Sequence, residues 1–272
     1  GSGVGTKNNY STNLLPTQYE TVVHPSTLWS DSSTAAGNMY FSATSTEIYS
    51  LYVQNNGASK NVNIAPSTDA TSGSKLLKIC GDLRVNNGSK LNISKGSEVH
   101  ILGNMTDLNN AGSNLVIINS DSDQYGSLKL DGSYTNNGST NEVKYNLHMQ
   151  NAANGWDLKG SPFSSGEVDD STVFEENPST AGEYAAQVYD TANAEYDPTT
   201  SSSVSFTNGK GYAVAIDGDN NGNVGFVGGI QTSTVNIALV EKVGVGTGNQ
   251  WNLVSNPFST YIAINDNAKN AS

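Results

Sequence analysis

The feature that most constrains the fold is a regular spacing of glycines through the middle of the chain. Glycines fall at positions 73, 81, 88, 96 and 103, in alternating steps of eight and seven residues. Between them, two apolar residues repeatedly flank a polar one: Leu77 and Ile79, Leu83 and Val85, Leu91 and Ile93, Val99 and Ile101. Alternation with a period of two buries one face of a strand, and glycine suits tight turns. The pattern predicts short strands with these side chains pointing inward.

A longer period accompanies this spacing. Asparagine-rich turns end in glycine at residues 55–57, 86–88, 110–112 and 136–138, so these glycines are 31, 24 and 26 residues apart. Three short strands and three turns in roughly 24 residues correspond to one coil of a parallel β-helix, where each strand pairs with its counterpart one coil away. The competing interpretation is a meander of hairpins with Asn-Gly turns. The short strands and even glycine spacing favour the coil.

The character of the sequence changes between about residues 147 and 155, beyond which prolines at 162, 178, 198 and 257 and longer apolar stretches occur. No apolar pattern with a period of 3.6 residues is sustained anywhere, so we expect no ordinary helix. We therefore predict an all-β protein in three parts. Residues 1–50 form a lead-in or cap, residues 51–150 a parallel β-helix-like segment, and residues 151–272 a β-sandwich.

One nine-residue segment occurs twice, as residues 156–164 (WDLKGSPFS) and residues 251–259 (WNLVSNPFS). The recurring large residues are Trp156, Leu158, Pro162 and Phe163 in the first copy, and Trp251, Leu253, Pro257 and Phe258 in the second. Such a repeat indicates one structural unit used twice. The favoured interpretation is that Trp and Leu, two positions apart on one face of a strand, fill a core while proline ends the strand. The alternative is a pair of aromatic platforms for sugar rings.

A candidate calcium loop lies at residues 217–223 (DGDNNGN). Its possible oxygen ligands alternate, at Asp217, Asp219, Asn221 and Asn223, and Gly222 takes the sixth position, as in the opening of a calcium-binding loop. The bidentate glutamate that usually closes such a loop is missing, because Gly228 takes the twelfth position. The competing interpretation is a plain hairpin tip.

Charge and composition exclude several classes of function. The net charge of −12 argues against a nucleic-acid partner, because phosphate binding needs clustered Lys and Arg. No apolar run approaches the roughly 20 residues that span a bilayer, so we expect no membrane insertion. The three histidines are isolated from one another and no Gly-x-Ser-x-Gly motif occurs, so we expect no enzyme. A carboxylate pair for glycoside cleavage could still be assembled from Glu98, Asp107, Asp123 and Glu142.

Residues 83–145, with their Asn-Gly-Ser turns and Gly103-Asn104-Met105-Thr106, together with the two tryptophan motifs, resemble large extracellular proteins of Bacteroidetes. That resemblance implies export by the type IX secretion route and an extracellular or outer-surface location. Proteins of this kind usually end in a separate sorting domain, so we expect the sequence to be a truncated or processed form. It also implies candidate O-glycosylation at Ser171 and Thr191, which lie in Asp-Ser-Thr and Asp-Thr-Ala.

Three functions remain in competition. The first is a non-catalytic secreted or cell-surface structural or adhesin protein, binding an extracellular polysaccharide, a protein or its own copies. The second is a carbohydrate-binding accessory module of a polysaccharide-degrading system, which predicts a row of exposed rings drawn from Tyr184, Tyr189, Tyr196 and Tyr212. The third is a β-helical polysaccharide lyase or hydrolase. Calcium is the one cofactor that the sequence suggests.

Overall fold

The computed structural model is all-β in the part of the chain that it describes, which confirms the predicted class. The described residues are 20–23, 38–41, 45–53, 60–66, 75–86, 89–108, 115–137, 143–149, 155–164, 166–170, 173–199, 204–217, 222–240 and 251–262. Within these ranges there is no α-helix, and hence no helix long and apolar enough to cross a membrane.

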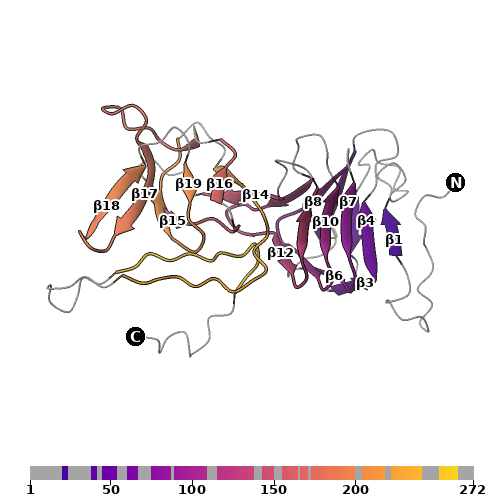
Figure 1. Ribbon diagram of the computed structural model, residues 1–272. Helices are drawn as coiled ribbons and strands as arrows, with labels where there is room; N and C mark the ends of the chain where they lie inside the picture. Colours follow the sequence, from indigo (N-terminus) through magenta and orange to yellow (C-terminus); the bar gives the residue numbers. More distant parts are fainter. Residues whose placement is uncertain are drawn as a thin grey trace.

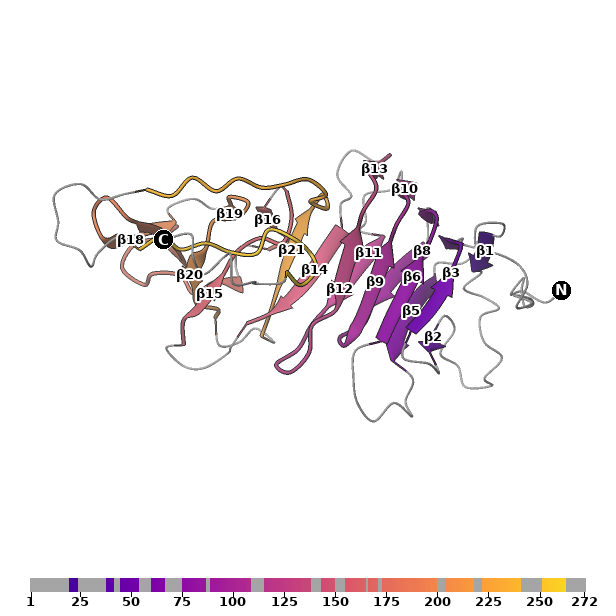
Figure 2. The same cartoon turned by 90° about the horizontal axis from the view of Figure 1, so that it is seen from below.

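The first fourteen strands pair in a fixed order. They are β1 (Glu20–Val23), β2 (Asn38–Phe41), β3 (Ser45–Ile48), β4 (Ser50–Val53), β5 (Lys60–Pro66), β6 (Lys75–Ile79), β7 (Leu83–Asn86), β8 (Ser89–Ile93), β9 (Ser97–Ile101), β10 (Met105–Leu108), β11 (Val116–Asn119), β12 (Ser127–Leu130), β13 (Tyr134–Asn136) and β14 (Val143–His148). Each pairs in parallel with the strand three places along the chain, giving the orders β1-β4-β7-β10-β13, β2-β5-β8-β11-β14 and β3-β6-β9-β12 (Figures 1 and 2). We call one passage through the three sheets a circuit.

The length of a circuit is close to the spacing of the asparagine–glycine turns. Paired residues are 22 positions apart between Leu83 and Met105, and 32 apart between Leu51 and Leu83. The pairing also starts earlier than the sequence suggested. Strands β1 to β3 join the same three sheets, so regular pairing is already present at these strands within residues 1–50, the predicted lead-in or cap.

The core consists of apolar columns that run through the circuits. In the third sheet, Ile79 lies opposite Ile101, and Ile101 lies opposite Leu130. All eight side chains that the glycine spacing placed inside are completely buried, which confirms that prediction: Leu77, Ile79, Leu83, Val85, Leu91, Ile93, Val99 and Ile101. Each circuit therefore covers the apolar face of the next, as in proteins built from stacked repeats.

The corner between the third and first sheets carries a ladder of hydrogen bonds. Gly81 and Gly103 are stacked there, and the Gly103 N–H donates to the Gly81 carbonyl at 3.0 Å. Beside them, Asp82 Oδ1 accepts from the Asn104 N–H at 2.8 Å, and Asn104 Oδ1 accepts from the Ser133 N–H at 3.0 Å. The polar side chains at this corner therefore link neighbouring circuits by hydrogen bonds, as the paired strands do within each sheet.

We expect Gly103→Ala to destabilise the protein by about 1–3 kcal/mol, the usual effect of forcing an atom into a closed space. A Cβ atom at Gly103 would lie 2.5 Å from the Gly81 carbonyl oxygen, so the backbone of two circuits would have to separate. The matched control is Gly229→Ala, where the nearest atom would be a side-chain oxygen at 3.2 Å. Urea unfolding followed by circular dichroism measures both. An equal loss in the two variants would contradict the steric argument.

The remaining strands pair in antiparallel fashion. They are β15 (Asp157–Lys159), β16 (Gly166–Val168), β17 (Tyr184–Asp190), β18 (Glu195–Thr199), β19 (Ser205–Phe206), β20 (Tyr212–Val214) and β21 (Asn223–Gly228). Strands β21, β16 and β19 extend the second sheet beyond β14, and the others form a separate sheet in the order β15-β20-β17-β18. The Phe206 ring contacts the rings of Phe174, Tyr212 and Phe226, and these aromatic side chains join the two groups of strands.

The last circuit is covered by later parts of the chain. β21 pairs along the whole of β14, from Val143 opposite Gly228 to His148 opposite Asn223. At β12, the Leu128 N–H donates to the Ser259 carbonyl at 2.8 Å, and the Ser259 hydroxyl donates to the Leu128 carbonyl at 2.7 Å. Exposed strand edges tend to pair with other chains, and these contacts cover the edge of β14 along its length and that of β12 at Leu128.

Candidate binding groove

Each of the two copies of the tryptophan motif contains the same kind of turn. In the first copy, Ser161 Oγ accepts a hydrogen bond from the Phe163 N–H at 3.1 Å. In the second, Asn256 Oδ1 accepts from the Phe258 N–H at 3.0 Å. Ser and Asn are interchangeable at this position because both side chains can accept a bond from the backbone two residues on. The repeat is therefore a polar turn built around a buried proline.

The tryptophans of the motif do not fill the core. Trp156 is 49% exposed, Leu158 62% and Trp251 69%, and Leu253 is half-buried. Phe163, by contrast, is completely buried. The prediction that Trp and Leu plug a core is wrong for three of the four side chains. Trp156 and Leu158 are both exposed, as two positions on one face would be, but little of the chain covers that face.

The two motifs lie side by side although 95 residues separate them in the chain. The first contributes β15, which pairs with β20. The second runs beside the residues that precede β20, with Val254 opposite Lys210 in an isolated antiparallel bridge. Gly160 lies so close to Ser255 that a Cβ atom there would be 2.0 Å from the serine hydroxyl oxygen. Positions 160 and 255 are equivalent in the two copies, so the copies meet at matching points.

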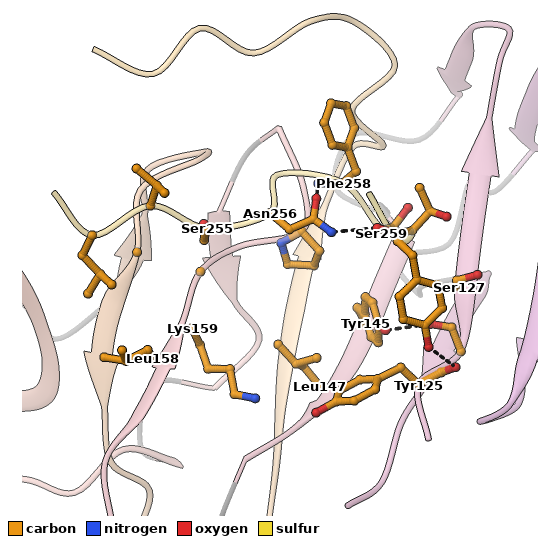
Figure 3. Close-up of a pocket in the computed structure, with 18 residues that line it drawn as sticks. Tyr125, Ser127, Tyr145, Leu147, Leu158, Lys159, Ser255, Asn256, Phe258 and Ser259 are labelled. Atoms are coloured by element: carbon orange, nitrogen blue, oxygen red, sulfur yellow. Dashed lines mark hydrogen bonds between the residues drawn. The ribbon is translucent and has the colours of Figure 1, made fainter. Parts of the chain in front are cut away.

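A groove of about 400 Å³ separates this pair of motifs from the last circuit (Figure 3). Leu158 and Lys159 form one side, Tyr125, Tyr145 and Leu147 form the other, and residues 253–261 complete it. The complete lining is Tyr125, Gly126, Ser127, Tyr145, Leu147, Leu158, Lys159, Gly160, Pro162, Gly211, Leu253, Val254, Ser255, Asn256, Phe258, Ser259, Thr260 and Tyr261. Concave sites of this size with mainly apolar walls are the usual place for a small ligand.

Three tyrosines dominate one side of the groove. The Tyr145 hydroxyl donates to the Gly126 carbonyl at 2.6 Å, and burial raises the pKa of this phenol far above its ordinary value. The Tyr261 hydroxyl donates to the Tyr125 carbonyl at 3.3 Å. Burial, with Tyr125 and Glu98 nearby, raises the pKa of Tyr261 too. Both hydroxyls donate to backbone carbonyls, so these residues offer the groove mainly the surface of their rings.

Several other polar side chains of the wall are bonded to the protein, although the buried Ser127 hydroxyl has no hydrogen-bond partner. Asn256 Nδ2 donates to the Thr260 carbonyl at 2.7 Å, and the Ser255 hydroxyl donates to the Lys210 carbonyl at 3.0 Å. These bonds hold the second motif in place. Lys159 differs, because its ammonium lies 6.0 Å from the centroid of the Tyr125 ring, within the range of a cation–π contact.

We expect Ser259→Ala to lower the free energy of unfolding by about 1–3 kcal/mol, because the variant removes the buried hydroxyl that bonds the Leu128 carbonyl. Ser255→Ala is the matched control, since its hydroxyl bonds a carbonyl at an exposed position, and we expect a loss below about 1 kcal/mol. Thermal unfolding measures both. Equal losses would show that Ser259 does not fasten the second motif to β12.

The calcium and glycosylation predictions fall partly outside the described residues. Asp219, Asn221 and Ser171 are not described. Among the described residues, no group of three or more His, Cys, Asp or Glu side chains could hold a metal ion. Thr191 is buried, and its hydroxyl donates to the Trp251 carbonyl at 2.6 Å. In the folded protein this hydroxyl is engaged, so the structure argues against a glycan at Thr191.

The residues suggested for sugar binding and cleavage are scattered. Tyr212 is buried and accepts a bond from the Thr207 N–H, so the expected row of four exposed tyrosines does not form. Tyr196 is exposed and packs edge-on against half-buried Tyr189, with Tyr184 half-buried as well. Of the suggested carboxylates, Asp107 is completely buried, Glu98 is half-buried, Asp123 lies in an exposed turn, and Glu142 is outside the described residues.

Comparison with protein-family models, with curated proteins and with solved structures found no match. The case for function therefore depends on the geometry. The sequence does not predict the groove, because its residues come from five separate parts of the chain. The only sequence signal was the repeat, which marked residues 156–164 and 251–259 as related but not as neighbours.

Proposed function

We propose that this chain is a non-catalytic extracellular surface protein with a structural or adhesive role. In this proposal, strands β1 to β14 form a parallel β-helical rod, and the antiparallel strands that follow form a sandwich-like head. The observation that carries it is the unbroken parallel pairing of every third strand from β1 to β14.

A rod of this kind suits a display role for physical reasons. Each circuit satisfies the backbone hydrogen bonds of its neighbours and buries its share of the apolar columns, so stability grows with the number of circuits. The head covers the last circuit through β21 and Ser259. It also carries exposed apolar side chains that a binding surface can use, including Trp156, Trp251 and Tyr261.

The proposed location is the outer cell surface, reached by the type IX route, on the strength of the resemblance of the two tryptophan motifs to Bacteroidetes surface proteins. The test is to label intact cells of the native producer with an antibody against the chain, before and after external protease. We expect the antibody to label intact cells, and we expect external protease to remove that labelling. A chain found only inside intact cells would overturn the proposal.

The adhesive role has its own test. Beads coated with the full chain should bind to polysaccharide-coated or protein-coated surfaces, or to one another, more strongly than beads coated with the heat-unfolded chain. Light scattering at high concentration reports on self-association. If the folded beads bind no better than the unfolded ones on any surface, the adhesive role fails.

A second candidate function is a carbohydrate-binding accessory module, which the tyrosine-lined groove favours. Rings and apolar walls suit the C–H faces of sugars, and a few fixed polar groups supply orientation. Calcium at residues 217–223 remains a proposal for either function. Two measurements test the calcium proposal: calorimetric titration of the chain with calcium, and the shift in its melting temperature when calcium is added.

A further inference from the structure

Lys159 is the one lysine in the lining of the groove. Lys78, Lys95, Lys129 and Lys144 each have a carboxylate within 4.0 Å, at Glu47, Asp121, Asp131 and Asp169 respectively. Lys159, like Lys90 and Lys210, has no such carboxylate among the described residues, and its ammonium lies near the Tyr125 ring. No described carboxylate therefore competes with a ligand for the Lys159 ammonium.

The surroundings of Lys159 favour an anionic ligand. Leu147, Leu158, Leu253 and Pro162 contribute apolar surface around it. A charge pair is stronger beside such walls than in open water. The net negative charge of the protein is screened beyond about 8 Å at physiological salt. The lining itself carries one charge, the Lys159 ammonium, while Glu98 lies near Tyr261 but outside the lining.

The rest of the groove favours a sugar ring as the body of that anion. Tyr261 is 60% exposed, so its ring is open to solvent at the rim. The volume of about 400 Å³ is at the lower end of small-molecule sites, which suits one or two sugar units. The Ser255 and Ser259 hydroxyls and the Asn256 amide are held in internal bonds, so they give little preference for a charged over a neutral ligand.

We propose that this groove binds an acidic sugar, a uronate unit of a polysaccharide. Lys159 pairs with the carboxylate, and Tyr125 and Tyr261 contact the ring. This inference rests on the second candidate function, carbohydrate binding, and names its ligand class.

The experiment is calorimetric titration of the full chain with uronate trisaccharides of galacturonate, mannuronate and glucuronate, each beside its fully methyl-esterified form. We expect at least one acid to bind at least about tenfold more tightly than its ester, the factor expected for one charge-assisted hydrogen bond. Lys159→Gln should remove that preference and leave ester binding unchanged. Tyr261→Ala should weaken acid and ester alike.

The matched control is Lys90→Gln, which makes the same change of charge on β8, outside the groove lining, and should keep the preference. Unfolding midpoints confirm that each variant is folded. Acid and ester binding equally well, or a preference that survives Lys159→Gln, would overturn the acidic-sugar inference alone. No binding of any trisaccharide at millimolar concentration would overturn carbohydrate binding as well. Surface labelling would be unaffected, so the two failures are distinguishable.

Discussion

Ile101→Ala is expected to lower the free energy of unfolding by about 2–5 kcal/mol, the range for large-to-small changes in a closed core. Ile101 is completely buried and lies between Ile79 of one circuit and Leu130 of the next. Removing its side chain leaves a cavity between two stacked circuits, and the hydrogen-bonded strands on both sides limit how far the cavity can collapse.

The next residue in the chain provides the control. Leu102 is 38% exposed, and Leu102→Ala should lower the free energy of unfolding by less than about 1 kcal/mol. The Leu102 N–H bonds the Ile79 carbonyl in either case, because the substitution leaves the backbone intact. Urea unfolding of the two variants measures the contrast. A larger loss for Leu102→Ala would mean that the strand faces the other way, and the core described above would be wrong.

Phe163→Ala is expected to lower the free energy of unfolding by about 3–5 kcal/mol, as much as Ile101→Ala or more. The ring is completely buried behind Pro162, and the turn that positions it is closed by the bond from the Phe163 N–H to Ser161. The Phe163 carbonyl also accepts a bond from Asn208 Nδ2 at 2.6 Å. Phe163→Ala keeps the backbone N–H and carbonyl that make these bonds. The loss in free energy of unfolding therefore measures the burial of the ring.

Trp156→Ala is the matched control within the same motif. Although its side chain is larger, Trp156 is 49% exposed, and we expect a loss of no more than about 1–2 kcal/mol. Thermal and urea unfolding measure both variants. If Trp156→Ala is the more damaging of the two, the tryptophan fills the core as its sequence spacing first suggested, and its exposed position is wrong.

The stacked circuits were largely readable from the sequence. The alternation around Ile79, Val85, Ile93 and Ile101 identified the buried face of each strand, and the described glycines of the series, at 81, 96 and 103, lie between strands. Both signals are local, because a strand shows its two faces within three residues. The corner ladder of Asp82 and Asn104 was not foreseen, since its bonds join residues of different circuits.

The tryptophan motif shows the limit of such signals. Its spacing placed Trp156 and Leu158 on one face, and its proline marked the end of a strand, but the face proved to be the open one. A strand sequence tells which side chains share a face, while burial depends on what another part of the chain lays over it.

By itself, then, the sequence determined the β class, the length of a circuit and the side chains that fill its interior, because each is encoded by short-range periodicity. Only the tertiary structure decided how the circuits end and where a ligand could bind. Lys159, Tyr125, Tyr145 and Tyr261 form one groove because the two motifs meet and Ser259 bonds to β12. These contacts join residues 95 and 131 positions apart, and no local pattern shows which distant segments will meet.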